Sequence, residues 1–306
     1  MKNLTLPSSG RAFGPPLKSN VSRQNMPLFK YLHPDRTDVL RGQSIRFTSP
    51  AALNDPFELK PHLATLASPE YMAAELNRAI PRVLEEELAK VPSELRQLVP
   101  AAAVHALLQS QLPEAQCGLE SMAALLMPRL QQAMARKFEE LIGVLCLSES
   151  ADSLLMWAHY ADSHRGFVLE FDEGSPFFDC RVGQDDELRH LRKVTYSQKR
   201  PSLALADVED FSAFMTKGTD WEYEAEWRMI VTLDSASRIL GGGAEAIHLF
   251  NFPAEAVTSV VFGCRMLDSK KAEIRQLLSE SKRYRHVRCV EAEISEEHYR
   301  VTVPRN

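Results

Sequence analysis

One short stretch restricts the fold more than any other: Asp220–Arg228, which packs acidic, aromatic and cationic side chains directly before the apolar run Met229–Leu233. The apolar run is rich in residues that favour strands, so it predicts a buried β-strand with the polar cluster at its mouth. Residues two apart share a face of an extended backbone. We therefore expect Glu224 and Glu226 to project together, with Arg228 next in line.

The paired carboxylates allow two interpretations. Neighbouring like charges push the pKa of one carboxyl group upward, so that one acid holds a proton while the other stays ionised. In that case the tryptophan and tyrosine side chains beside the paired acids could form the wall of a pocket. Alternatively, Glu224 and Glu226 form ion pairs with Arg228 at the strand end, and the tryptophans are core residues.

Composition sets broad limits on function. The chain has 306 residues, 44% hydrophobic and 25% charged, which is typical of a soluble globular protein of one large or two ordinary domains. The formal net charge of −5 argues against a general binder of phosphate backbones. We therefore regard nucleic acid as an unlikely partner.

The cysteines indicate a reducing compartment. They are five in number, far apart, and show neither zinc-ligand spacing nor a disulfide framework. No apolar stretch approaches the length of a membrane-spanning helix, and the N-terminus lacks the apolar region of a signal peptide. We expect a cytoplasmic protein with no membrane partner and no bound metal.

The hydrophobic pattern predicts an α+β fold with a mixed or largely antiparallel sheet. Residues 1–26 form a flexible arm in this interpretation, and 27–306 form one domain with a helical insertion at about 68–142. In the insertion we expect three amphipathic helices, the first beginning at Ser68 and the third kinked at Pro128. Strands are expected at 27–32, 44–48, 143–148, 166–171, 191–196, 227–233, 257–262, 287–294 and 299–303, and helices at 37–41, 153–161, 207–216 and 269–281.

Two further stretches carry unusual polar chemistry. In the segment 155–166, His159 could carry a proton or donate to a ligand, or it could be a satisfied structural residue. The tripeptide His164–Gly166 could contact an anion, although its glycine could simply permit a turn into the next strand. The acids of Asn54–Glu58 could bind a ribose hydroxyl or a cation, or the segment could be a stiff turn.

Several motifs in order along the chain resemble the signature of a bacterial family catalogued as domain of unknown function 2971. The resemblance runs from about Leu28 to Phe262 and implies candidate positions but no reaction. It rests on Leu28–Tyr31, Ile45–Pro50, Asn54–Glu58, Leu155–Asp162, Gly166–Phe167 and Trp221–Arg228.

A second resemblance suggests chemistry, because Glu224-Ala225-Glu226 is similar to the Glu-x-Glu element of ADP-ribosyltransferases. This similarity implies that NAD is the substrate, with Glu226 holding the nicotinamide ribose and stabilising an oxocarbenium-like state. Glu224 would help to activate the acceptor. Residues expected to position the dinucleotide are Arg46, Trp157, His159 and Tyr160; Lys30, His33, Arg36 and Arg46 all compete for the early basic position of such enzymes.

We therefore expect an NAD-consuming ADP-ribosyltransferase or NAD glycohydrolase, with the acceptor left open, in bacterial defence or effector function. Its nucleotide pocket would be built from Arg46, Asn54, Asp55, Trp157, His159, Tyr160, Trp221, Glu224, Glu226 and Arg228. An alternative is a non-catalytic nucleotide-sensing or interaction module. A third hypothesis is a magnesium-dependent nuclease that uses Asp55, Glu58, Glu224 and Glu226.

Overall fold

A computed structural model describes residues 26–96, 100–207 and 211–304. These residues divide into two compact units. The first contains 60–96, 100–136, 201–207 and 211–213, and the second contains 26–59, 137–200 and 214–304. Apart from Met26, the predicted flexible arm lies outside the described residues.

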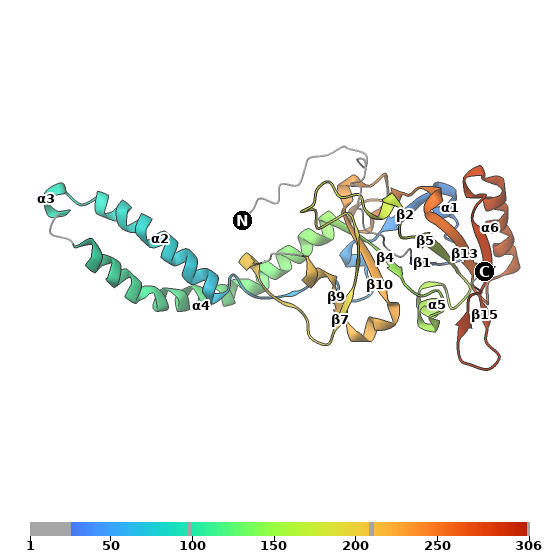
Figure 1. Cartoon of the computed structure of the whole chain (residues 1–306), viewed down its shortest axis with the longest axis horizontal. Helices are drawn as coiled ribbons and strands as arrows, with labels where there is room; N and C mark the ends of the chain where they lie inside the picture. The colour runs from blue at the N-terminus through green and yellow to red at the C-terminus, as the bar shows by residue number, and fades with distance from the viewer. Residues whose placement is uncertain (1–25, 97–99, 208–210, 305–306) are drawn as a thin grey trace. The chain divides into compact units, whose positions relative to one another are not determined.

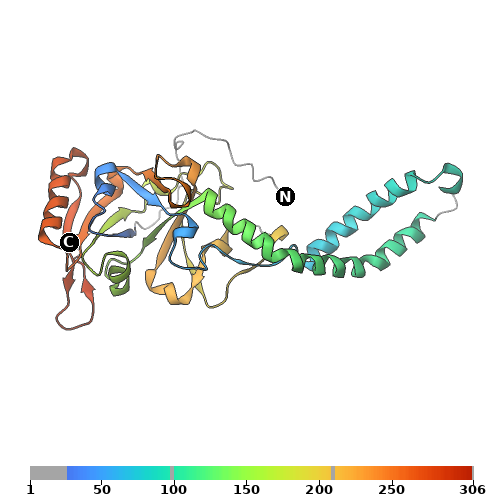
Figure 2. The same ribbon diagram turned by 180° about the vertical axis from the view of Figure 1, so that it is seen from behind.

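The second unit is built on a seven-stranded sheet of order β14-β13-β5-β1-β4-β10-β6. Neighbouring strands pair antiparallel except β13 and β14, which are parallel. Helix α6 (Asp268–Glu280) connects that parallel pair, as Figure 1 and the reverse view in Figure 2 show. The mixed sheet confirms the predicted α+β class. The strands are β1 (Pro27–Leu32), β4 (Ile142–Ser148), β5 (Phe167–Asp172), β6 (Leu191–Lys193), β10 (Glu226–Thr232), β13 (Val257–Phe262) and β14 (Arg288–Glu291).

Alternation along β10 separates apolar from charged side chains. Met229 and Val231 belong to the main hydrophobic core on one face of the sheet. Residues of the other parity lie on the opposite face, where Glu226 pairs with Ser148 and Arg228 with Cys146 of β4. The predicted shared face of Glu226 and Arg228 is therefore confirmed.

A smaller core covers part of the sheet around helix α5 (Leu154–Tyr160). Ser153 caps this helix by accepting from the backbone N–H of Met156. Trp157 is fully buried in this core, packs edge-on against Tyr31, and donates from Nε1 to the carbonyl of Ala151 at 2.8 Å. Helix α5 is thereby anchored, which fixes the position of the residues at its end.

Shorter elements complete the second unit. Helix α1 (Asp38–Gly42) follows β1, and three small sheets lie around the main one. Short 3-10 helices include η1 (Pro50–Ala52) and η5 (Thr219–Glu224). The small sheets join β2 (Ser44–Phe47) to β12 (Ile247–Asn251) and β11 (Arg238–Leu240), β7 (Thr195–Ser197) to β9 (Thr216–Gly218), and β15 (Glu293–Ile294) to β16 (Val301–Thr302).

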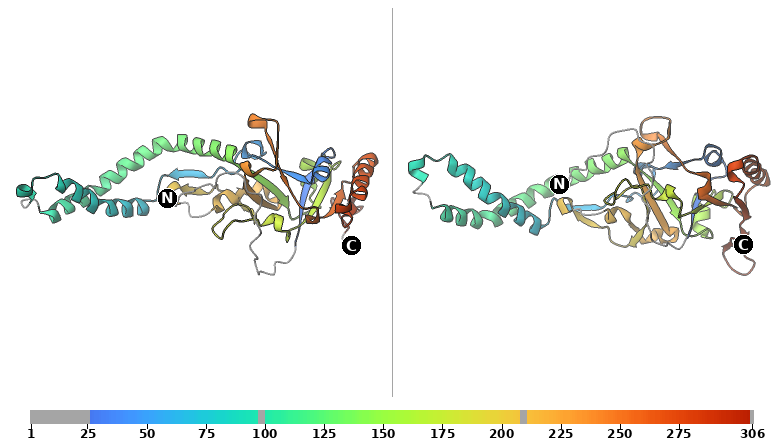
Figure 3. Two further views of the ribbon diagram at one scale, coloured as in Figure 1. Left: turned by 90° about the horizontal axis from the view of Figure 1, so that it is seen from above. Right: turned by 45° about the horizontal axis from the view of Figure 1, so that its top comes forward.

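The first unit is mainly helical. Helices α2 (Pro69–Ala89) and α4 (Ala101–Leu141) form a hairpin with the short α3 (Ser93–Arg96) at its turn, as the two views of Figure 3 show. A two-stranded parallel sheet pairs β3 (His62–Thr65) with β8 (Ser202–Ala204). Ser68 caps α2 by accepting from the N–H of Tyr71, as its sequence predicts. No helix within the described ranges is long and apolar enough to cross a membrane.

Four predictions of local structure are wrong. The second and third helices predicted in the insertion are largely one helix, α4, which contains two prolines and continues past both. The predicted strand 191–196 is divided between β6 and β7, and the predicted strand 287–294 between β14 and β15; in each case the two strands belong to different sheets. The predicted helix 207–216 is not found in its described part, where a 3-10 turn spans Ser212–Met215 and leads into β9.

Candidate functional site

Glu226 and Arg228 form the centre of a buried charged cluster. The guanidinium donates from Nε to Oε1 of Glu226 at 2.9 Å and from Nη2 to Oε2 at 2.8 Å. Arg228 is 1% exposed and Glu226 is 2% exposed. This two-point pairing is the arrangement that a planar guanidinium and a carboxylate favour, and it follows from their i, i+2 spacing on β10.

The loop after η1 brings a third carboxylate to the cluster. Asp55 forms a turn, in which Oδ1 accepts from the N–H of Phe57 and the carbonyl accepts from the N–H of Glu58 at 3.1 Å. The buried Glu58 carboxylate then accepts from Nη2 of Arg228. Asp55 therefore acts as a turn former, and Glu58 is the acid of this segment that reaches the charged cluster.

Lys217 of β9 joins the acids together. Its Nζ lies 2.6 Å from Oε2 of Glu224, 3.2 Å from Oε2 of Glu226 and 3.2 Å from Oε2 of Glu58. We call Glu58, Lys217, Glu224, Glu226 and Arg228 the ion network. Each of these five side chains is at most 5% exposed.

Glu224 reaches the network by a route that the sequence did not predict. It is the last residue of η5 rather than part of a strand, and Ala225 takes a left-handed conformation with φ 43°. Ser148 holds this turn by donating to the carbonyl of Glu224 at 2.6 Å, and the N–H of Glu149 donates to the carbonyl of Ala225. The expectation of one extended segment is therefore wrong, and the two carboxylates meet through Lys217.

The charges set the protonation states within the network. Burial raises the pKa of Glu226, but Arg228 and Lys217 outweigh that effect and lower it to about 2. Burial lowers the pKa of Lys217, whereas the three carboxylates raise it and prevail. The pKa of Glu58 is raised, because burial and the charge of Glu226 exceed the effect of its cations. The upward shift expected within the pair of Glu224 and Glu226 is not found at Glu226, whose pKa moves downward. The carboxyl group whose pKa rises is Glu58, and burial is the largest cause of that rise.

Two neighbours continue this polar region. Lys30 of β1 donates from Nζ to the carbonyl of Cys146 at 2.9 Å, and burial lowers its pKa. Burial also raises the pKa of the Cys146 thiol, so this cysteine is a protonated, unreactive group. Tyr196 accepts from the N–H of Glu226 at 2.8 Å.

An aromatic rim, which we define as Asn54, His159, Tyr160, Trp221 and Tyr223, lies next to the ion network. Tyr160 Oη donates to Oε1 of Glu224 at 2.5 Å and accepts from Nδ2 of the exposed Asn54 at 2.6 Å. His159 Nδ1 and the Tyr223 hydroxyl share a hydrogen bond of 3.0 Å. The ring centroid of Trp221 lies 4.9 Å from Nζ of Lys217. A chain of contacts therefore leads from the buried charges to exposed polar groups.

The structure assembles most of the predicted site residues and leaves out three. Asn54, His159, Tyr160, Trp221, Glu224, Glu226 and Arg228 are brought together in the rim and the network. Trp157 is a core residue, and Asp55 is committed to its turn. Arg46 lies in β2 with its Nε buried and without a hydrogen-bond partner among the described residues, and no contact joins it to the network.

Sequence reasoning missed Lys217 and Tyr223 as site residues. Lys217 lies in a three-residue strand with no hydrophobic alternation, and the only available signal was its position shortly before the cluster that starts at Asp220. Tyr223 was within that cluster, but its side chain could be assigned only when α5 brought His159 to it.

The acids of the network are already compensated by cations. Each of the three carboxylates contacts Lys217, and two of them also contact Arg228. Among residues 26–96, 100–207 and 211–304, no three His, Cys, Asp or Glu side chains are grouped as metal ligands. The nuclease hypothesis gains no support from this geometry.

Two cavities lie apart from the network. One of about 530 Å³ is lined by residues that include His164 and Arg265, and another of about 220 Å³ is lined by residues that include Phe29 and Arg288. Neither is lined by a residue of the ion network or the aromatic rim. The predicted nucleotide pocket therefore does not coincide with either cavity.

Together these features define an α+β protein whose mixed sheet carries a buried ion network beside an aromatic rim. A sequence model of the family described as "Protein of unknown function (DUF2971)" matches residues 156–229. That segment begins in α5 and ends in β10, and it includes Tyr160, Lys217, Glu224, Glu226 and Arg228. The predicted family resemblance is therefore confirmed over this segment. Comparisons with curated proteins and with solved structures found no match.

Proposed function

We propose that this protein binds NAD at the aromatic rim and cleaves its N-glycosidic bond, with Glu224 as the carboxylate that faces the ribose. One observation carries the proposal. The hydrogen-bonded chain from Lys217 through Glu224 to Tyr160 and Asn54 connects a buried carboxylate with polar groups near the surface.

The contacts favour Glu224 over Glu226 as the reacting acid. Both oxygens of Glu226 accept from Arg228, and Oε2 is also contacted by Lys217. Oε1 of Glu224 accepts from Tyr160, whose hydroxyl is also bonded to the exposed Asn54. A ribose hydroxyl can replace the Tyr160 hydroxyl as donor to Glu224, whereas replacing Arg228 would leave a buried charge unpaired.

The chemistry requires a carboxylate and a binding surface for two rings. When the bond from ribose C1′ to the nicotinamide nitrogen breaks, its electron pair leaves with nicotinamide, and positive charge develops on the ribose. A carboxylate beside the ribose stabilises that charge. Water or another acceptor then adds to C1′ and loses a proton, so NAD and water give ADP-ribose, nicotinamide and H⁺. Trp221 and Tyr223 supply aromatic faces for stacking.

The free thiols of the five cysteines fit a reducing compartment, and we propose the cytoplasm, where NAD is present, as the place of action.

A second candidate is a non-catalytic binding or interaction module. The observation that favours it is that the five charged side chains of the ion network are buried and bonded to one another. Such a network can be purely structural, and buried ion pairs are common in proteins without catalytic function.

The deciding experiment measures nicotinamide and ADP-ribose by liquid chromatography and mass spectrometry after incubation with NAD, with and without cell lysate as a source of acceptor. Wild type is compared with Glu224→Gln. The matched control is Glu187→Gln, which removes an acid with a side chain 46% exposed that pairs with Arg192. We expect release by wild type and the control, and a loss of about 100-fold or more in Glu224→Gln.

Folding of each variant is checked by tryptophan fluorescence. If folded wild type leaves NAD intact in every sample, NAD cleavage is refuted. Stabilisation of the intact fold by NAD without cleavage would then identify a nucleotide-binding module. If NAD neither reacts nor stabilises the protein, the network is structural.

A further inference from the structure

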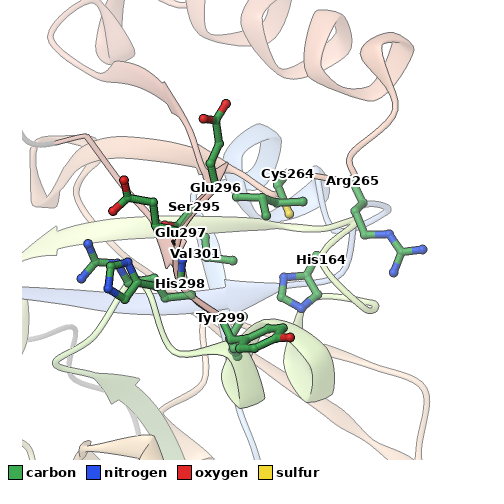
Figure 4. A pocket seen from close by; sticks show the side chains of 12 residues that line it. His164, Cys264, Arg265, Ser295, Glu296, Glu297, His298, Tyr299 and Val301 are labelled. Carbon is green, nitrogen blue, oxygen red and sulfur yellow. Dashed lines mark hydrogen bonds between the residues drawn. The ribbon is translucent and has the colours of Figure 1, made fainter.

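The cavity of about 530 Å³ lies within the second unit, beside the segment after α5 and the hairpin of β15 and β16. Figure 4 shows His164, Cys264 and Arg265 along one side, with the hairpin residues from Ser295 to Val301 along the other. Its volume lies within the range that small-molecule sites occupy.

The backbone that presents His164 is unusual. Asp162, Ser163 and His164 have φ values of 47°, 53° and 69°, all in the left-handed region. That conformation costs roughly 1–2 kcal/mol for each residue other than glycine. Three consecutive residues of this kind persist only where the surrounding structure fixes them, and such strain concentrates at functional sites.

Specific contacts hold the strained segment in place. The N–H of His164 donates to the carbonyl of Trp157 at 3.1 Å, and its carbonyl accepts from the N–H of Arg265 at 3.1 Å. Arg165 donates to both oxygens of Asp162 at 2.9 and 2.8 Å. A Cβ on Gly263 would lie 2.2 Å from the carbonyl oxygen of His164, so only glycine allows this close approach.

His164 lines the cavity, and its two ring nitrogens, Nδ1 and Nε2, have to be considered separately. Nδ1 is buried and has no hydrogen-bond partner among the described residues. Burial and the charge of Arg265 lower the pKa of His164, so the ring is neutral near pH 7. A neutral imidazole has one N–H donor and one acceptor nitrogen, and an unpaired buried acceptor is less costly than an unpaired buried N–H. With the proton on Nε2, the ring has a donor for a ligand in the cavity.

Arg265 supplies a positive charge beside this donor. It is exposed, lines the same cavity, and forms no ion pair within the described part of the chain. Glu296 and Glu297 also line the cavity and oppose a second negative charge on a ligand. Leu154, Ile294 and Tyr299 supply apolar surface at its edge.

We infer that this cavity binds a small molecule with one carboxylate on an apolar body, the carboxylate being held by Arg265 and by Nε2–H of His164. Cys264 adds no covalent chemistry, since burial raises the pKa of its thiol. The site lies apart from the ion network, and its existence does not depend on the proposed NAD cleavage.

The test uses histidine-labelled full-length protein and follows the imidazole signal of His164 by NMR. The signal is assigned as the one missing in His164→Asn, because asparagine tolerates a left-handed backbone. Benzoate is the probe, benzamide is its neutral counterpart of the same shape, and inorganic phosphate is a multivalent anion without an apolar body. We expect a saturable shift with benzoate that benzamide and phosphate do not produce.

Two arginine variants make the test specific. Arg265→Gln is expected to weaken benzoate binding by about tenfold or more, since it removes a charge-assisted hydrogen bond. Arg288→Gln changes an arginine of the other cavity and should leave binding unchanged. The inference is overturned if benzoate gives no saturable shift, if benzamide or phosphate binds as tightly as benzoate, or if Arg265→Gln binds benzoate like wild type.

Discussion

Arg228→Met tests whether the ion network contributes to stability as its contacts indicate. Methionine replaces the guanidinium side chain with an uncharged one of roughly similar length, so the donors to Glu226 and Glu58 are lost. The carboxylates of Glu226 and Glu58 stay buried. Three carboxylates would then face Lys217 as their nearest cation. We expect a large loss of folding free energy.

The magnitude follows from the pKa of Glu226. Its fall from 4.5 to about 2 corresponds to about 3 kcal/mol in favour of the charged form. Arg228 is the largest favourable contributor to that fall, and burial opposes it, so removing Arg228 should cost at least this amount. Breaking a buried ion pair generally costs about 3–5 kcal/mol. Both values predict that Arg228→Met lowers the free energy of unfolding by about 3 kcal/mol or more.

Urea denaturation followed by tryptophan fluorescence measures this loss. The three tryptophans all lie in the second unit, so the signal reports the unit that contains the network. With a urea dependence of about 2–3 kcal/mol per molar, the midpoint should fall by about 1–2 M. Glu187→Gln, at an exposed pair, should change the free energy of unfolding by less than about 1 kcal/mol.

A double variant separates charge imbalance from lost packing. Arg228→Met with Glu226→Gln removes one cation and one carboxylate together, and it should be more stable than Arg228→Met alone. A midpoint for Arg228→Met equal to that of Glu187→Gln would refute the reasoning. A double variant less stable than Arg228→Met would show that packing, rather than charge, is the main contribution.

Three further predictions concern other parts of the second unit. Because the folded pKa of Glu226 is depressed to about 2, its contribution to stability is present above pH 4.5 and is lost as the pH falls towards 2. Glu226→Gln lacks this contribution, so in urea titrations it should lose less stability than wild type over that acid range. The raised pKa of Glu58 acts in the opposite direction in the wild type. Gly263→Ala should cost about 1–3 kcal/mol because its Cβ would meet backbone, whereas Gly183→Ala, with open space around it, should be nearly neutral in the same assay. Tyr160→Phe should cost about 1–3 kcal/mol by removing a hydrogen-bond donor to a buried carboxylate, and an unchanged midpoint would contradict the assigned bond.

The local parts of the fold could be predicted because they depend on near neighbours. Alternation placed Glu226 and Arg228 on one face of β10, and the serine before α2 identified its N-terminus. Predictions were wrong where local signals were ambiguous. The hydrophobic pattern suggested separate second and third helices in what is largely one helix, α4, and the segments 191–196 and 287–294 each contribute to two sheets.

The sequence by itself determined the mixed α+β class, the shared face of Glu226 and Arg228, and the turn that contains Asp55, since each depends on residues a few positions apart. Only the tertiary structure decided which charges meet. Glu58 and Arg228 are 170 positions apart, and Lys217 reaches three acids from a strand too short to predict. The same long-range burial decided the direction of each pKa shift, because desolvation and the approach of cations depend on packing that no local pattern encodes.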